Sequence, residues 1–93
     1  MLIARVIGTV VATRKHELLV GSKIQVVQPL NAITGKPDGE PFVAVDAVGA
    51  GVSEEVIVVR GSSARFAVKK DTVPVDATII GIIDEVNIEG IYS

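Results

Sequence analysis

The chain has 93 residues, which is enough for one domain (residues 1–93) and not for two. It carries a formal net charge of −2 and no cysteine, which excludes disulfide frameworks and zinc–thiolate sites and disfavours nucleic acid, a partner that needs clustered Lys and Arg. Hydrophobic residues make up 48% of the chain, yet no charge-free run approaches the roughly 20 residues that a membrane-spanning helix needs.

Five runs rich in Val, Ile and Thr give the chain a dominant β character. Arg5 interrupts the first run and no basic region precedes it, so we expect a first strand there and not a signal peptide. The predicted strands cover residues 2–13, 23–30, 41–48, 55–60 and 78–88. Because turn-forming residues separate these runs, the sequence predicts a mainly β fold, a small five-stranded OB-like β-barrel.

One short helix is predicted between the fourth and fifth strands. Residues 61–67 (GSSARFA) offer a serine N-cap followed by residues that tolerate a helix. Residues 73–76 are expected to be extended, because Pro74 disfavours the helical conformation at Val73.

Both faces of the first and last predicted strands are apolar, whereas a strand with one face in water alternates apolar and polar residues. Strict alternation divides the apolar residues of the first strand between its two faces. One face carries Leu2, Ala4, Val6, Val10 and Ala12. The other face carries Ile3, Ile7 and Val11. In the last strand, the same alternation places Ile80, Ile82, Val86 and Ile88 on one face and Ile79 and Ile83 on the other. A small barrel can enclose only one face of each strand, so we expect a second copy of the chain to cover the other.

Candidate catalytic and metal-binding residues are few. His16 is the only histidine and lies in a polar stretch, which is typical of a surface residue. Asp46, Asp76 and Asp84 each lie in an apolar context, where two carboxylates could form an acid–base pair of an enzyme. The favoured interpretation is that they accept backbone N–H groups or pair with arginines, so no catalytic residue, metal site or cofactor is predicted.

The glycine loop Gly49-Ala50-Gly51 is neither a dinucleotide fingerprint, since position 54 is Glu, nor a phosphate-binding loop of the Gly-Lys-Ser/Thr type. It predicts a tight turn where the backbone approaches a neighbour closely. An alternative function, an OB-like ligand or single-stranded nucleic-acid binding module, would use stacked aromatics in a positive groove. The chain offers only Phe42, Phe66 and Tyr92 for stacking, so this alternative is disfavoured.

Three segments together resemble the EutN/CcmL family, the vertex proteins of bacterial microcompartments. They are LIARVIGTVVATRKHELLVGSKIQVVQPL, PFVAVDAVGAGVSEEVIVVRGSSAR and VPVDATIIGIID, and the resemblance runs from about residue 1 to residue 86. It implies a structural shell protein, not an enzyme. Such a protein forms a homopentamer that caps the five-fold vertices of a cytoplasmic microcompartment, beside hexameric shell proteins, with no nucleic acid, membrane or cofactor involved.

The resemblance also points to residues with a role in assembly. Two segments match the family's glycine loop and its Gly-Ser-Ser-Ala-Arg sequence, and we expect them at the subunit contact or the central opening: Gly49, Ala50, Gly51, Gly61, Ser62, Ser63, Ala64 and Arg65. The chain departs from the family pattern in one place. Val52, Ser53 and Glu54 follow the glycine loop where another glycine is expected, which affects the predicted conformation of the loop.

Overall fold

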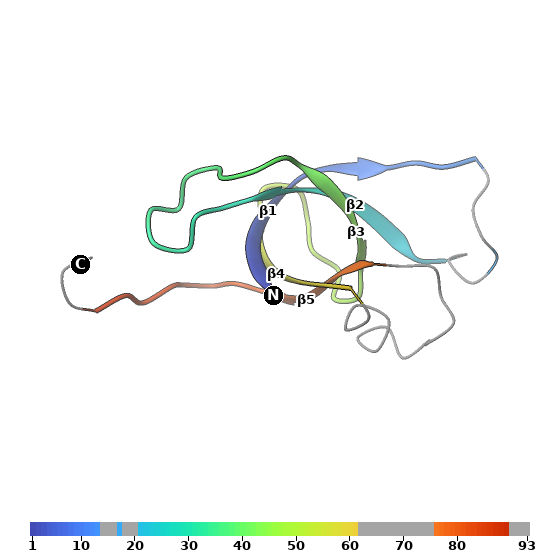
Figure 1. Ribbon diagram of the computed structural model, residues 1–93. Coiled ribbons are helices and arrows are strands. Elements are labelled where there is room, and N and C mark those ends of the chain that lie inside the picture. Colours follow the sequence, from blue (N-terminus) through green and yellow to red (C-terminus); the bar gives the residue numbers. More distant parts are fainter. Residues whose placement is uncertain (14–16, 18–20, 62–75, 90–93) are drawn as a thin grey trace.

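Five β-strands make up the regular structure of the residues that the structure describes (Figure 1). The computed structural model describes residues 1–13, 17, 21–61 and 76–89. The strands are β1 (Leu2–Val10), β2 (Lys23–Pro29), β3 (Phe42–Asp46), β4 (Glu55–Arg60) and β5 (Ala77–Ile82). The prediction of a mainly β, five-stranded barrel is confirmed. The predicted helix and the extended stretch around Pro74 lie outside the described residues, apart from their ends at Gly61 and Asp76.

The strands close into a barrel in the order β1-β2-β3-β5-β4, and Figure 1 looks along it so that the strands form a ring. Four of the five strand pairs are antiparallel. The fifth, between β3 and β5, is parallel and short, with Val45 opposite Thr78 and Asp46 opposite Ile79. Because closure removes every sheet edge within the paired region, the barrel needs no further strand for its hydrogen bonds. No helix among the described residues is long and apolar enough to cross a membrane.

The first and last strands are shorter than predicted. β1 ends at Val10, and the last ladder pair joins it to Ile24. β5 ends at Ile82, because its partner β4 begins at Glu55. The Ile83 amide donates to the Glu55 carbonyl at 2.8 Å, at the end of this ladder. The predicted continuation to residue 88 is wrong. Residues 83–89 instead leave the barrel and run beside the β2–β3 loop (Figure 1).

A β-bulge in β1 changes which residues face the inside of the barrel, so the faces predicted by strict alternation are wrong beyond the bulge. The register shifts between Val6 and Gly8, so Thr9 pairs with the buried Gln25 and Val10 pairs with Ile24. Strict alternation therefore fails after Val6, and Val10 does not share the inner face of Ala4 and Val6. A bulge adds one residue to one strand of a pair, which exchanges the faces of all residues beyond it.

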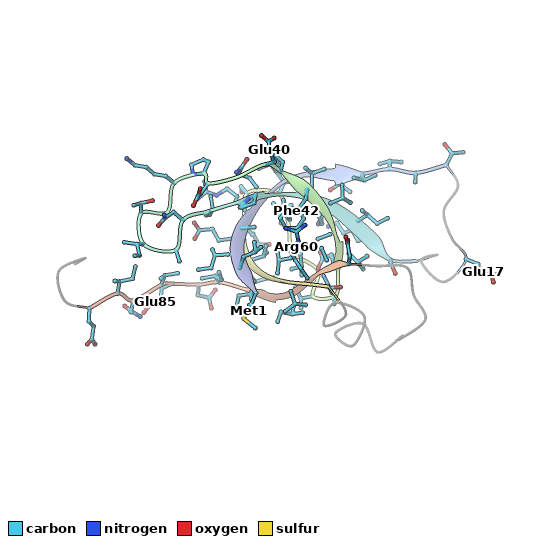
Figure 2. All side chains as sticks on the ribbon, in the orientation of Figure 1. Met1, Glu17, Glu40, Phe42, Arg60 and Glu85 are labelled. Atoms are coloured by element: carbon cyan, nitrogen blue, oxygen red, sulfur yellow. The ribbon has the colours of Figure 1, made fainter. Side chains whose placement is uncertain are left out.

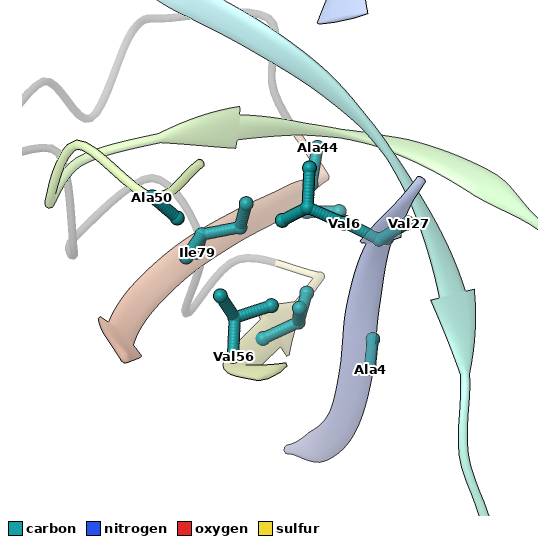
Figure 3. Close-up of a cluster of buried hydrophobic side chains, with 9 residues drawn as sticks. Ala4, Val6, Val27, Ala44, Ala50, Val56 and Ile79 are labelled. Carbon is teal, nitrogen blue, oxygen red and sulfur yellow. The ribbon is translucent and has the colours of Figure 1, made fainter. Parts of the chain in front are cut away.

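The core of the barrel is built from small and medium apolar side chains (Figure 3). Its buried members are Ala4, Val6, Val27, Ala44, Ala50, Val56, Val58, Ala77 and Ile79. Inward positions on all five strands contribute, because a barrel of only five strands leaves room for little more than alanine and valine. Among the described residues, Ile79 is the largest of the completely buried side chains, and it belongs to this cluster.

Candidate assembly surfaces

The glycine loop is shaped by one carboxylate at the end of β3. Asp46 Oδ1 accepts the backbone N–H groups of Val48 and Gly49 at 2.9 and 2.8 Å, and Oδ2 accepts that of Ala50 at 2.8 Å. Aspartate favours such turns because its short side chain reaches backbone amides two to four residues ahead. For Asp46, the interpretation that it accepts backbone N–H groups is confirmed, and both its oxygens are engaged in this turn.

A buried amide ties the glycine loop to the barrel. Gln25 on β2 is completely buried, and its Nε2 donates to the Ala50 carbonyl at 2.8 Å and to Asp46 Oδ2 at 3.3 Å. Its Oε1 accepts the Thr9 hydroxyl at 2.8 Å, so both ends of the amide are used. Lys23 Nζ also donates to the Ala50 carbonyl, at 3.2 Å. The loop is therefore a rigid feature, since buried polar groups that are fully paired specify one arrangement.

Left-handed backbone conformations make the turn possible. Gly49 has a φ of 80°, and a Cβ at that position would meet no atom within 4 Å, so conformation and not space selects glycine there. Ser53 has a φ of 77° and is the only non-glycine residue with positive φ among those described. Its amide donates to the Val6 carbonyl at 2.7 Å. Ser53 thus adopts, at the place where the sequence departs from the family pattern, a conformation that glycine favours.

The glycine loop and Gly61 lie at opposite ends of β5. The Ala47 amide donates to the Ile79 carbonyl, after which the loop continues in the direction of β5, because β3 and β5 are parallel. Gly61, with a φ of 71°, donates instead to the Asp76 carbonyl, just before β5 begins. Of the second predicted segment, only Gly61 is placed by these contacts, and it does not bond to the glycine loop. Residues 62–65 lie outside the described residues, and the assembly role of all eight residues stays a prediction.

The carboxylates do not combine into an acid–base site in the described part of the chain. Asp76 and Asp84 are exposed, whereas the Asp46 oxygens are held by amides. Among the described residues, no group of three or more His, Asp or Glu side chains is arranged to hold a metal ion. Glu55 forms an ion pair with Arg5 at 3.0 Å across the β1–β4 ladder, a pairing expected of neighbours on adjacent strands.

Phe42 is the one aromatic residue within the described ranges, and its ring is covered. The Arg60 guanidinium carbon lies 4.4 Å from the centroid of the ring, and in the view of Figure 2 along the barrel both side chains lie within the outline of the ring of strands. Phe42 also packs against the core cluster. A half-buried ring with a cation over its face is not a free platform for a base, so this contact weighs against the nucleic-acid alternative.

Sequence comparison identifies the family. The family described as "Ethanolamine utilisation protein EutN/carboxysome" matches residues 1–84. The chain belongs to the EutN/CcmL family. The family assignment made from the three sequence segments is confirmed, and the matched range includes the whole barrel with its glycine loop.

Named members of the family are closely similar to this chain. The shell vertex protein GrpN of Rhodospirillum rubrum is 51% identical over 88 residues, covering 92% of this chain and 96% of its own. The carboxysome shell vertex protein CcmL of Synechococcus elongatus is 51% identical over 89 residues, covering 96% and 89%. These names describe shell components and not enzymes, in agreement with the expected structural role.

Solved EutN/CcmL structures share the fold. The GrpN pentameric microcompartment shell protein from Rhodospirillum rubrum aligns with a TM-score of 0.86 at 46% identity, covering 96% of this chain and all of its own. Gloeobacter violaceus CcmL aligns with a TM-score of 0.87 at 44% identity, covering 96% and 91%. Gln25 and Lys23, whose side chains hold the glycine loop, were not among the predicted site residues. The signal was a polar residue between apolar neighbours in KIQVVQ, at a position that the strand period turns inward.

Proposed function

We propose that this protein is a structural vertex protein of a bacterial microcompartment shell, acting as a ring of five copies. One observation carries the proposal: a pentameric shell protein of the same family aligns with almost the whole chain at 46% identity. That identity and a TM-score of 0.86 indicate a shared barrel, which supports the same mode of association for this chain. The microcompartment shell in the cytoplasm is the place where such a ring functions.

The exposed apolar surface of a single chain supports a ring. Ile7, Val43 and Val52 are about half exposed, at 48, 51 and 56%. A small monomer with this much apolar surface in water would tend to aggregate, whereas neighbouring subunits in a ring would bury it. A ring of five uses a contact between two different surfaces of the chain that closes on itself.

Hexameric shell proteins are the proposed partners of the ring. Tiles with six-fold symmetry pack into flat layers, so a closed polyhedral shell needs units with five-fold symmetry at its corners. The projecting β2–β3 loop and the segment 83–89 stand away from the barrel (Figure 1), where they are accessible to such neighbours.

The eight residues of the two family segments are proposed to lie at the subunit contact or around the central opening. They are Gly49, Ala50, Gly51, Gly61, Ser62, Ser63, Ala64 and Arg65. Small side chains suit both places, because they let five chains approach one axis. Arg65 is proposed to bridge to a carboxylate or a terminal carbonyl of the next subunit. An Arg65→Ala ring of unchanged stability would remove that role.

Shell closure tests the proposed function directly. We expect a hexameric shell protein expressed alone to form sheets or open tubes, and the same protein co-expressed with this chain to form closed polyhedra. Electron microscopy of purified assemblies distinguishes open sheets or tubes from closed polyhedra. The control is co-expression of the hexameric protein with an unrelated protein of about 10 kDa. Closed particles that lack this chain, or open tubes that persist in its presence, would contradict the proposal.

A further inference from the structure

We infer that Asp38 and Gly39, in the projecting β2–β3 loop (Figure 1), form a site of spontaneous covalent modification, at which aspartate isomerises to isoaspartate through a succinimide. The inference goes beyond the proposed function and does not depend on it. Residues 38 and 39 are the only Asp-Gly pair in the chain, and the chain has no Asn-Gly pair. Because glycine has no side chain, its amide nitrogen can approach the preceding carboxyl carbon more closely than that of other residues.

The reaction needs no enzyme and no second reactant apart from water. The Gly39 nitrogen attacks the side-chain carboxyl carbon of Asp38, and a C–N bond forms. The carboxyl group, in its protonated form, loses its hydroxyl group, which leaves with the amide proton as one molecule of water. Water then opens the succinimide at either of its two carbonyls. Opening at the side-chain carbonyl restores aspartate, whereas opening at the main-chain carbonyl gives isoaspartate.

Both reacting groups are accessible in the folded chain. Asp38 and Gly39 are exposed, and no hydrogen bond or ion pair joins the Asp38 carboxylate to another described residue. The Gly39 amide likewise has no acceptor in the described part of the chain. An amide that donates a hydrogen bond must lose it before its nitrogen can attack, so the state of the Gly39 amide favours the reaction.

Asp46 shows the opposite arrangement. Its carboxylate accepts three backbone N–H groups of the glycine loop, and the amide of the next residue, Ala47, donates to the Ile79 carbonyl at 3.2 Å. Both reacting groups are therefore engaged, and attack would require the turn to open. Asp76 and Asp84 are exposed, but an alanine and a glutamate follow them, and a side chain on the attacking residue hinders ring closure.

Isomerisation changes the loop at its base. The Asp38 amide donates to the Pro29 carbonyl at 2.9 Å, and Gln28 Nε2 donates to the Gly39 carbonyl at 3.0 Å. Isoaspartate inserts one carbon atom into the main chain between these two anchor points, so both bonds cannot keep their present geometry. The α-carboxylate that it leaves beside the chain is the group that isoaspartyl methyltransferases esterify with S-adenosylmethionine.

An endoprotease that cleaves before aspartate, but not before isoaspartate, provides the readout. The purified, folded protein is kept at neutral pH for several weeks and is then denatured and digested. We expect peptide 1–45 to accumulate at the expense of peptides 1–37 and 38–45, while cleavage before Asp46 continues and serves as an internal reference. Methyl transfer by an isoaspartyl methyltransferase measures the same product independently. An unchanged yield of peptide 38–45, without methyl transfer, would overturn the inference.

Ala47→Gly is the matched control, because it creates a second Asp-Gly pair where both reacting groups are hydrogen-bonded. We expect Asp46 in this variant to isomerise about tenfold more slowly than Asp38 in the same molecule, since hydrogen bonds must break first. Asp38→Glu should remove the methyl-accepting site, because glutamate would have to close a larger ring. Equal rates at the two Asp-Gly pairs, or isomerisation of Asp38 in urea only, would show that the folded loop does not provide a reactive site and would overturn the inference.

Discussion

Replacing Ile79 by alanine should destabilise the protein by about 2–5 kcal/mol, the range found for large-to-small changes in well-packed cores. Ile79 is completely buried and lies in the cluster that fills the barrel. Its neighbours are mostly alanine and valine held on five paired strands, so they have little freedom to close around the cavity. The lost contacts and the remaining void both lower the free energy of unfolding.

Urea unfolding at one fixed protein concentration measures this change, because stability that depends on association varies with concentration. Ile33→Ala is the matched control. It removes the same atoms from a side chain that is 50% exposed on the β2–β3 loop, and it should cost less than about 1 kcal/mol. Equal losses for the two variants would show that the interior of the barrel is not the principal source of stability.

Replacing Asp46 by alanine should cost about 2–3 kcal/mol, because its carboxylate accepts three backbone N–H groups and one side-chain N–H. The amides of Val48 and Gly49 lie in an exposed turn and can bind water instead. The Ala50 amide and the buried Gln25 Nε2 have less access to water, and their loss accounts for most of the expected change.

Asp46→Asn separates the contribution of the two carboxylate oxygens. An asparagine can still accept from Val48 and Gly49 through its oxygen, but its amide nitrogen would face the Ala50 N–H and Gln25 Nε2, which are both donors. We expect a loss of about 1–2 kcal/mol, between wild type and Asp46→Ala. Thermal or urea unfolding of the three proteins provides the ranking. An asparagine variant as stable as wild type would contradict the role given to the second oxygen.

The positions of the strands could be predicted from sequence because each strand is rich in β-branched residues and followed by turn residues. The residue at which a strand ends depends, however, on how far its partner strand extends. The sequence of the strand alone does not contain this information. Ile83 to Ile88 has the composition of a strand, but β4 offers no ladder beyond Glu55 for it to join. The bulge after Val6 could not be predicted from the sequence for a related reason, because it depends on the register between β1 and β2.

Less of the candidate assembly site than of the fold could be predicted from the sequence. The glycine loop and the role of Asp46 as an acceptor of backbone N–H groups followed from local sequence, because the turn spans only a few residues. Gln25 was missed because its three partners, Thr9, Asp46 and Ala50, come from distant parts of the chain. The positive φ of Ser53 likewise depends on the pairing of its amide with Val6, which no local pattern reveals.

The native mass of the purified protein tests the central claim most directly. One chain has a mass of 9.7 kDa, so a ring of five copies has a mass of about 48.5 kDa, five times 9.7 kDa. Native mass spectrometry is expected to show that species as the dominant one at micromolar concentration. A stable, soluble species of 9.7 kDa under the same conditions would contradict the ring, and with it the proposed vertex function.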